Sequence, residues 1–526
     1  MVHDTQHINS SGDIGGNGLP GSARDLLEKM TLIIASNRGP LEFQIEEDGG
    51  YSTRRGSGGV VTAVSAVSRY NDLIWVASAM TEGDRRRAHE ADEAGDVFIS
   101  PPDSSDVRLR FVLAEEEAYD GYYNRISNPL LWFLQHYLWD TPRSPDIGQE
   151  TWRAWRDGYV TVNRQFAEEI VAAARASERK PLVMLQDYHL YLAPGMIREM
   201  LPDVTLQHFI HIPWPDPDYW QLLPREMRSV ICHSLLANDI VGFQTSSHAR
   251  SFMNTCDVNL EGVDLDYRHR EIHYQGRTTK VAVYPISIDC EAVEAVAASE
   301  DALRHEEHLA TFLNEYTIVR VDRAEPSKNI VRGFLAYDRF LEKYPEFIGR
   351  VNFLAFLVPS RLEVLEYVDY LDDINTVVGR INTKYANAAE QDGVAWQPIS
   401  LFIGDDYPRA LAALKRYDVL LVNAIFDGMN LVAKEGALLN QQDGVIILSE
   451  AAGAYQQLGP HSLTVSPTDV ESTAEAIHTA LTMNREKRAA WSRELRELVR
   501  TQNIRAWIYA QIDDLAKLTP SGQRFR

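Results

Sequence analysis

Residues 418–435 read DVLLVNAIFDGMNLVAKE and combine an apolar run, a glycine and a helical pattern in one short stretch. A continuous run of Val and Leu is typical of a strand that is buried on both faces of a parallel sheet. In open α/β sheets, ligands bind at the carboxyl ends of such strands, which is where Asp427 and Gly428 stand. The stretch therefore predicts a strand–turn–helix unit with functional side chains at the turn.

The same rhythm of apolar runs and helical patterns extends to both sides of this unit. Further strands are predicted in the second half of the chain at 317–321, 351–358, 399–403, 444–449 and 462–466, and in the first half at 31–35, 73–78, 181–185, 206–210, 239–243 and 280–286. Alternating strands and helices predict parallel sheets that are covered by helices on both faces. Because the two series meet near residues 285–292, the sequence predicts an α/β protein with two Rossmann-like domains that face each other across a cleft.

These patterns also predict where the domains begin and end. Residues 1–28 are rich in Gly, Ser and Asn and are expected to form a disordered tail. The N-terminal domain is expected at 29–286 and the C-terminal domain at 287–487. A long helix at 488–520 is expected to return to the N-terminal domain.

Composition excludes several classes of protein. The 526-residue chain has a formal net charge of −23, which disfavours nucleic acid and anionic membranes as partners. It has three cysteines and no CxxC spacing, so neither a disulfide framework nor a structural zinc site is expected. A reducing, cytoplasmic location is expected instead. No run of about 18 apolar residues predicts a membrane span, and the polar N-terminus lacks a signal-peptide core.

In the second half of the chain, charged residues follow two of the predicted strands. Arg323 and Lys328 flank the loop after strand 317–321, next to a predicted helix N-terminus at which a diphosphate could be held. Two cations placed there would stabilise a leaving diphosphate without a metal ion. The competing interpretation is a solvated charged loop.

At the second strand end, Asp427 could bind sugar hydroxyls. The first N–H groups of the next helix, near Asn430–Val432, are expected to point into the cleft. Glu435 lies about two turns further along, on the same helix face.

The first half of the chain offers weaker signals of the same kind. Arg38 follows the first strand, and the glycine cluster at 56–59 opens a predicted helix, an arrangement that suits an anion but also an ordinary turn. Asp187 follows strand 181–185 and His211 follows strand 206–210, although a helix cap and a core histidine would explain them equally. The aromatic stripe from Tyr123 to Trp132 is more often core than ligand platform.

Taken together, these motifs resemble one family. The motifs SNR (36–38), YYNRISNPLLW (122–132), DYHL (187–190), HIPWP (211–215), an Arg–Lys pair five residues apart (323 and 328) and DGMNLVAKE (427–435) are similar to those of the trehalose-6-phosphate synthases of glycosyltransferase family 20. The resemblance runs from about residue 31 to residue 515. It implies a GT-B fold and a retaining transfer with neither a metal ion nor another cofactor, in which the leaving phosphate takes the proton of the acceptor.

The resemblance also implies which residues bind each substrate. The nucleotide sugar, UDP-glucose or a relative, would contact the C-terminal domain and one N-terminal glycine, namely Gly59, Arg323, Lys328, Asp427, Asn430, Leu431, Val432 and Glu435. Glucose 6-phosphate would contact Arg38, Tyr123, Trp132, Tyr188 and Arg361. Asp187 and His211 would line the reaction centre together with Arg323, Lys328 and Asp427. The resemblance leaves homo-oligomerisation open.

Two departures from the family pattern keep alternatives open. The loop Arg323–Asn329 reads RAEPSKN where the family usually has RLDYxKG, and Ala424–Phe426 replaces PLR. This loop and the stretch 211–231 resemble a pseudo-glycosyltransferase of the same fold that uses a cyclitol phosphate, and glycerol 3-phosphate is another acceptor to consider. A sugar-phosphate sensor without turnover is an alternative of another class. DxD patterns at Asp216–Asp218 and Asp264–Asp266 keep a metal-dependent transferase open.

Overall fold

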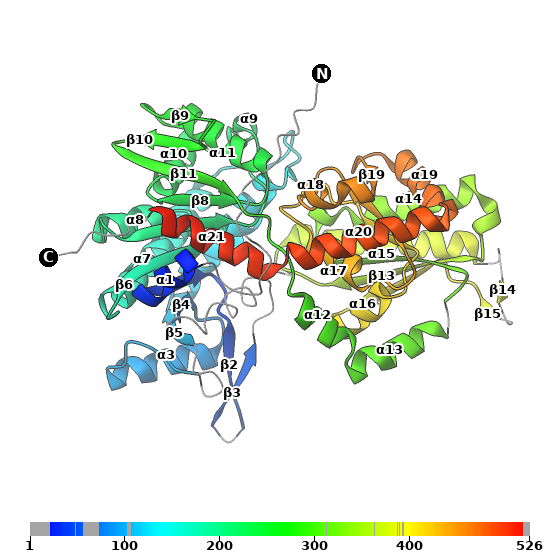
Figure 1. The fold of residues 1–526 in the computed structure, drawn as a ribbon, viewed down its shortest axis with the longest axis horizontal. Helices are drawn as coiled ribbons and strands as arrows, with labels where there is room; N and C mark the ends of the chain where they lie inside the picture. The colour runs from blue at the N-terminus through cyan, green and yellow to red at the C-terminus, as the bar shows by residue number, and fades with distance from the viewer. Residues whose placement is uncertain are drawn as a thin grey trace.

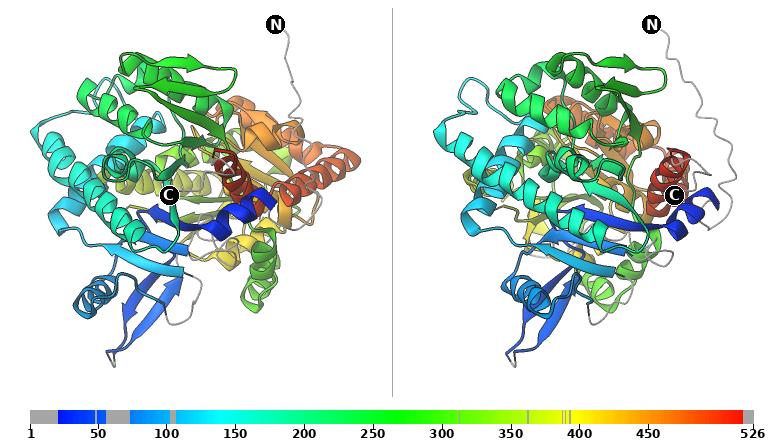
Figure 2. Two further views of the ribbon diagram at one scale, coloured as in Figure 1. Left: turned by 60° about the vertical axis from the view of Figure 1, so that its left-hand side comes forward. Right: turned by 90° about the vertical axis from the view of Figure 1, so that its left-hand side faces the viewer.

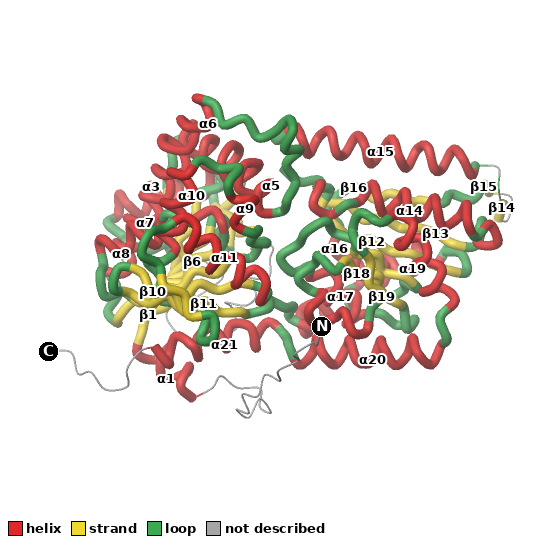
Figure 3. The backbone as a smooth tube through the Cα atoms, turned by 90° about the horizontal axis from the view of Figure 1, so that it is seen from above, coloured by secondary structure: helices red, strands yellow, loops and turns green. Residues whose placement is uncertain are grey.

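A computed structural model describes residues 21–518 except 48, 56–72, 102–106, 312, 362, 387, 389, 392 and 393. Within the described residues the strands form two large sheets, each lying between layers of helices (Figures 1 and 3). The predicted glycine cluster at 56–59, including Gly59, and the helix expected after it lie outside the described residues.

The first sheet has the order β5-β4-β1-β6-β7-β8-β11-β10-β9. Its strands are β1 (Met30–Ser36), β4 (Leu73–Ser78), β5 (Val107–Val112), β6 (Lys180–Gln186), β7 (Thr205–Ile210), β8 (Ile240–Phe243), β9 (Asp264–Asp266), β10 (Glu271–Tyr274) and β11 (Arg277–Val283). Pairing is parallel from β5 to β11, and β10 and β9 add an antiparallel edge. The strand expected at 280–286 ends at Val283, two residues before Pro285, which has no backbone N–H for a further ladder bond.

The second sheet is entirely parallel, with the order β16-β13-β12-β17-β18-β19. Its strands are β12 (Tyr316–Arg323), β13 (Val351–Val358), β16 (Ile399–Ile403), β17 (Val419–Val422), β18 (Val445–Ser449) and β19 (Leu463–Val465). All correspond to predicted apolar runs. Two small hairpins, β2 (Leu41–Ile45) with β3 (Tyr51–Arg55) and β14 (Glu390–Gln391) with β15 (Val394–Ala395), stand apart from the large sheets.

Helices cover both faces of each sheet, as continuous apolar strands require. In the first half they are α1 (Gly21–Lys29), α3 (Glu82–Ala94), α4 (Glu116–Asp120), α5 (Trp132–Gln135), α6 (Gln149–Arg153), α7 (Thr161–Arg175), α8 (Ala193–Met200), α9 (Pro217–Trp220), α10 (Arg225–Leu235) and α11 (Ser246–Asn259), with the π-helical segments η1 (Gly121–Leu131) and η2 (Ala154–Val160). In the second half they are α12 (Cys290–Ala297), α13 (Glu300–Ala310), α14 (Ile330–Lys343), α15 (Leu365–Tyr385), α16 (Tyr407–Leu414), α17 (Leu431–Leu439), α18 (Tyr455–Leu458), α19 (Val470–Thr482), α20 (Arg485–Thr501) and α21 (Ile504–Leu518).

The tail prediction is wrong for residues 21–28, because these residues belong to helix α1. Ala23, Leu26 and Leu27 are buried, and α1 lies beside α21 at the other end of the chain (Figure 2). Ser22 also donates a hydrogen bond to Asp513 of α21, 2.7 Å away. The apolar positions of this short segment therefore have a partner that composition alone did not reveal.

The expected closing helix is two helices rather than one. Helix α20 ends at Thr501, and Asn503 then accepts hydrogen bonds from the backbone of Arg505 and Ala506 to begin α21. Helix α20 packs on α17 of the second half, whereas α21 crosses to the first sheet (Figure 1). There Gln511 accepts a hydrogen bond from Gln207, 2.7 Å away and fully buried.

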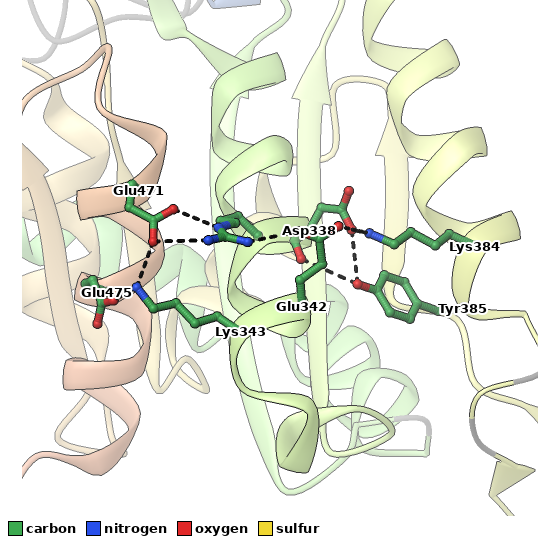
Figure 4. A network of polar contacts seen from close by, with 8 residues as sticks. Asp338, Glu342, Lys343, Lys384, Tyr385, Glu471 and Glu475 are labelled. Atoms are coloured by element: carbon green, nitrogen blue, oxygen red, sulfur yellow. Dashed lines mark hydrogen bonds and ion pairs between the residues drawn. The ribbon is translucent and has the colours of Figure 1, made fainter.

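The outer helices of the second half are joined by an ion-pair network (Figure 4). Lys343 of α14 pairs with Glu471 of α19 at 2.7 Å, and Lys384 of α15 pairs with Asp338 of α14 at 2.6 Å. Arg339 extends the same network through Glu471. Exposed pairs of this kind are screened by water and contribute little, so they support this helix layer but do not create it.

Close backbone packing on the N-terminal side generates a stability prediction. A Cβ atom at Gly158 of η2 would lie 2.6 Å from the backbone nitrogen of Tyr122 in η1. We expect Gly158→Ala to lower the free energy of unfolding by about 1–3 kcal/mol, as overpacking does. Urea denaturation measures the effect. Gly379→Ala is the matched control, because Gly379 lies exposed in α15 with no atom within 4 Å of the added methyl group. Equal stability of the two variants would contradict the packing argument.

Candidate active site

The candidate site lies where the carboxyl ends of the two sheets meet. The backbone there is in contact across the two halves of the chain: a Cβ atom at Gly428, after β17, would lie 1.9 Å from the carbonyl oxygen of His211, after β7. A Cβ atom at Gly453 would likewise lie 1.9 Å from the carbonyl oxygen of Gly428. The predicted residues of both halves are therefore brought together at one place.

At the floor of the site, Lys328 and Asp427 form an ion pair. The ammonium nitrogen lies 2.5 Å from Oδ2 of Asp427, and both side chains are almost entirely buried. Burial alone would lower the pKa of Lys328, but the carboxylates of Asp427, Glu325 and Asp322 outweigh it and raise that pKa. Burial alone would raise the pKa of Asp427, but the charge and hydrogen bond of Lys328 outweigh it, and the net shift is downward. Both groups therefore stay charged.

The loop that carries Lys328 is held by hydrogen bonds despite its unusual sequence. Asn329, which replaces the glycine of the family pattern, has φ 58° and ψ 39°, a left-handed conformation that asparagine tolerates. Its amide donates to the carbonyl oxygens of Asn423 and Pro467 at 2.8 and 2.6 Å. The backbone of Ile425 also donates to Ser327 at 2.9 Å, which ties this loop to the end of β17. The departure in sequence therefore leaves the loop anchored.

Above this pair, two guanidinium groups lie over one indole ring. Arg361 lies 4.0 Å from the ring centroid of Trp132 and Arg323 lies 5.5 Å from it. The Trp132 ring stacks in turn on His136 at 4.0 Å, and burial lowers the pKa of His136 to about 4, so that histidine is neutral near pH 7. Cations over an aromatic face are stabilised by its quadrupole. The arrangement places both guanidinium groups beside one indole ring.

Tyr188 joins the acceptor-side residues to this group. Its hydroxyl donates to Oδ1 of Asn128 at 2.7 Å and accepts from Arg361 at 3.3 Å. Arg361 also donates to the hydroxyl of Tyr367 in α15. Asn128, which is fully buried, therefore has a polar partner in Tyr188, which is itself buried.

Asp187 is held in a strained backbone conformation at the end of β6. Its φ is 70° and its ψ is 178°, a region that is almost restricted to glycine. Its carboxylate accepts the backbone N–H of His211 at 3.1 Å. Burial raises the pKa of Asp187 to about 7, in spite of that hydrogen bond and of the nearby Arg361 charge. Strain and a shifted pKa together are typical of a functional carboxylate.

His211 is oriented by a neighbouring amide. Its Nε2 lies 2.9 Å from Oε1 of Gln186, so Nε2 carries the proton and Nδ1 is left as a hydrogen-bond acceptor. Burial lowers the pKa of His211 to about 3. The imidazole is therefore neutral, and it can accept a hydrogen bond from a sugar hydroxyl. The ring also lies beside Trp507 of α21, with 6.0 Å between ring centroids.

The start of α17 supplies the predicted donor residues. Asn430 caps the helix by accepting the N–H of Ala433, and its amide donates to Asp427 at 3.2 Å. Leu431 is the first helical residue and Val432 the second, so their N–H groups lie at the helix end that favours anions. Glu435 accepts from the Tyr407 hydroxyl at 2.9 Å, and burial raises its pKa to about 7.

A small apolar pocket lies beside Tyr407 at the ends of β12, β13 and β16. It has a volume of about 80 Å³ and is lined by residues that include Val321, Phe356, Phe402, Ile403 and Tyr407. The Phe356 and Phe402 rings stack at 4.7 Å. Tyr407, which lines this pocket, donates its hydroxyl to the Glu435 carboxylate.

Two predicted acceptor residues have few polar contacts. Tyr123 stacks on His189 at 5.8 Å and on Tyr119 at 5.6 Å, so its ring is part of an aromatic row. The Arg38 side chain is exposed. Burial, followed by the charges of Arg361 and then Arg38, lowers the pKa of His189 to about 3. Arg38 thus lies close enough to this aromatic row for its charge to act on His189.

Phe426, which replaces an arginine of the family pattern, contacts the opposite half of the chain. Its ring lies 4.4 Å from that of Tyr137, which in turn lies 4.5 Å from Tyr219. The lost cation is thus replaced by an aromatic contact between the two halves.

Sequence reasoning missed three side chains that organise the site: Glu325, Gln186 and Tyr367. Glu325 is completely buried and lies within 3.1 Å of Arg323 and 3.4 Å of Arg361. The signal was present, because Glu325 stands at the aspartate position of the family loop. Gln186 precedes Asp187 directly, but nothing in its position indicates the contact with His211.

The DxD residues serve other contacts. Asp216 accepts a hydrogen bond from Ser251 at 2.6 Å, and Asp266 binds the backbone and ring of His269 at the edge strand β9. Among the residues that the structure describes, no group of three or more His, Cys, Asp or Glu side chains is arranged to hold a metal ion. No described helix is long and apolar enough to cross a membrane.

Comparison with known proteins places this geometry in a family. The sequence model of the family described as glycosyltransferase family 20 matches residues 30–517. The chain is 31% identical over 510 residues to the UDP-forming α,α-trehalose-phosphate synthase of Schizosaccharomyces pombe, covering 94% of this chain and 92% of that one. It is 26% identical over 494 residues to the validamine 7-phosphate valienyltransferase of Streptomyces hygroscopicus subsp. jinggangensis, covering 92% and 94%.

Solved structures agree with this result. The E. coli trehalose-6-phosphate synthase bound with UDP-2-fluoro glucose superposes with a TM-score of 0.78 at 26% identity, over 93% of this chain and all of that one. The Burkholderia xenovorans enzyme in complex with glucose-6-phosphate gives a TM-score of 0.76 at 27% identity, over 92% and 99%. The predicted GT-B fold is confirmed by this likeness. The chain belongs to glycosyltransferase family 20.

Proposed function

We propose that this protein is a retaining glycosyltransferase that transfers glucose from a nucleotide sugar to glucose 6-phosphate and forms trehalose 6-phosphate. The observation that carries the proposal is the meeting of Arg323, Lys328 and Asp427 with Arg361 and Tyr188 in one site. The relatives support it, because the Schizosaccharomyces pombe protein is UDP-forming and the solved relatives bind a UDP-glucose analogue and glucose-6-phosphate.

The residues divide the chemistry between them. Arg323 and Lys328, with the N–H groups at the start of α17, would hold the diphosphate and stabilise the charge that develops as it leaves. Asp427, Asp187 and neutral His211 would accept hydrogen bonds from donor-sugar hydroxyls and orient the sugar. The departing phosphate oxygen would take the proton of the acceptor hydroxyl, so no side chain needs to act as nucleophile. Metal-free stabilisation of this kind relies on cations that are already in position.

The acceptor would be bound on the N-terminal side. Arg361, lying over Trp132, would bind its phosphate together with Arg38, while Tyr188 and Tyr123 would contact the sugar. On the donor side, Glu435 would hold the ribose diol, and the base would enter the apolar pocket beside Tyr407. Gly59 stays a predicted donor contact outside the described residues.

A second candidate keeps the fold but changes the acceptor to a cyclitol phosphate. It is favoured by the Phe426–Tyr137 contact, which replaces a family arginine, and by the similarity to a valienyltransferase. A matrix of nucleotide sugars against glucose 6-phosphate, glycerol 3-phosphate and cyclitol phosphates separates the candidates by product mass. Absence of nucleoside diphosphate release with every pair, while substrates still bind, would favour the sensor interpretation instead.

We further propose that the enzyme acts in the cytoplasm and as two domains, 29–286 and 287–487. The three cysteines are free thiols, which fits a reducing compartment. The proposed boundary falls between β11 and α12, where the carbonyl of Ile286 accepts a hydrogen bond from buried Lys434. Domain closure would exclude water from the donor.

Arg323→Ala is expected to lower kcat by about 10²–10³-fold, since losing one preorganised charge costs on the order of 2.7–4 kcal/mol. Steady-state kinetics with the best substrate pair measures this. Arg339→Ala is the matched control, because Arg339 is equally exposed (44% against 46%) and is also paired with glutamates, but on the outer helix layer. An Arg323→Ala enzyme within twofold of the control would contradict the assigned role.

Nucleotide-sugar affinity is expected to increase as the pH rises through about 7. The pKa values of Asp187 and Glu435 are both raised to about 7, so deprotonation above that pH creates charged acceptors for hydroxyl groups. Calorimetric titration between pH 6 and 8 measures the dependence, and Asp187→Asn and Glu435→Gln should each flatten it. Affinity that falls with rising pH in the unchanged protein would contradict these roles.

Activity is expected to be unchanged in the presence of EDTA, because the cations of the site replace a metal ion. The assay is nucleoside diphosphate release with and without the chelator. Loss of activity that added manganese restores would show that this metal-free mechanism is wrong.

A further inference from the structure

Glu325 is a charged side chain without exposed surface, placed between two sites for anions. It lies two residues after the end of β12 at Arg323, and its relative exposure is 0%. Burial would raise the pKa of Glu325, but Arg323, Arg361 and Lys328 outweigh it, and the net shift is downward. A buried carboxylate is unfavourable unless cations and hydrogen-bond donors surround it, so its neighbours must be held in place.

The two carboxylate oxygens are divided between two arginines. Oε1 lies 3.1 Å from Nη2 of Arg323 and accepts from the Ser327 hydroxyl at 3.3 Å. Oε2 lies 3.4 Å from Nη1 of Arg361. Arg323 belongs to the proposed diphosphate site, whereas Arg361 belongs to the proposed acceptor-phosphate site. One carboxylate therefore contacts both cations.

We propose that Glu325 is a positioning residue that holds the donor cation Arg323 and the acceptor cation Arg361 in one arrangement, so that the affinities for both substrates share one determinant. The inference rests on the proposed function. Without the carboxylate, two guanidinium groups over the same indole ring would repel each other and move apart. With it, both are oriented before either anion arrives.

Positioning and simple electrostatics predict opposite results for Glu325→Gln. The substitution removes a negative charge from a site for anions. Charge alone therefore predicts tighter binding of both the nucleoside diphosphate and glucose 6-phosphate. Loss of positioning predicts that both bind about tenfold more weakly or worse, because each arginine loses a charge-assisted partner. Isothermal titration calorimetry with the nucleoside diphosphate of the preferred donor, and separately with glucose 6-phosphate, measures the sign directly.

Three further variants make the test specific. Glu325→Asp keeps the charge and should restore both affinities to within a few-fold. Glu306→Gln is the matched control: Glu306 also bridges two cations, Lys415 and Arg416, but in the α13–α16 contact, and it should leave both affinities unchanged. Arg361→Lys keeps the acceptor-site charge, yet should change the nucleoside diphosphate affinity at least threefold, because it disturbs the shared carboxylate. This last variant decides the question if Glu325→Gln does not fold.

Failure of the proposed function and failure of this inference give different results. If the unchanged protein binds neither probe, the proposed function is wrong and the inference falls with it. If the unchanged protein binds both probes, and Glu325→Gln binds them equally or more tightly, only the inference is wrong. Nucleoside diphosphate affinity that is unaffected by Arg361→Lys would overturn it as well.

Discussion

The structure of this site depends on pairing its buried charges with one another before any substrate is present. Lys328 and Asp427 meet at 2.5 Å, and Glu325 has no exposed surface although two arginines lie beside it. Separating Lys328 from Asp427, or Glu325 from both arginines, would leave an unpaired buried charge, which costs several kcal/mol. The ends of β12 and β17 and the loop after β13 are therefore tied together electrostatically. The same pairing places cations at the cleft, where an anionic ligand can also bind them.

Backbone shape makes this arrangement accessible from both halves of the chain. Gly428 lets the loop after β17 touch the carbonyl of His211, and a side chain at that position would separate the two sheets. Asp187 accepts an unfavourable conformation so that its carboxylate receives the backbone N–H of His211. Helix α21 supports the same region from behind, with Trp507 beside the His211 ring. Strain and close packing thus serve to place polar groups rather than to build the core.

The sequence predicts most of the architecture, because buried parallel strands are continuous apolar runs that need no partner to be recognised. Elements whose burial depends on distant contacts were missed: α1 is covered by α21, and the closing helix is interrupted where Asn503 caps a new one. In the site, the motifs indicated Asp427 and Arg323, but not that Glu325 would preserve the carboxylate of a loop that reads as degraded. The roles of Gln186 and Phe426 follow from contacts between segments far apart in the sequence, and no local pattern encodes them.

The most direct test of this account is a crystal structure of the protein with a nucleoside diphosphate and glucose 6-phosphate bound together. The account predicts diphosphate oxygens within hydrogen-bond distance of Arg323 and Lys328 at the start of α17, with the acceptor phosphate on Arg361 and the Glu325 carboxylate still between the two arginines. A diphosphate bound away from Arg323 and Lys328, or an acceptor phosphate that does not contact Arg361, would contradict it.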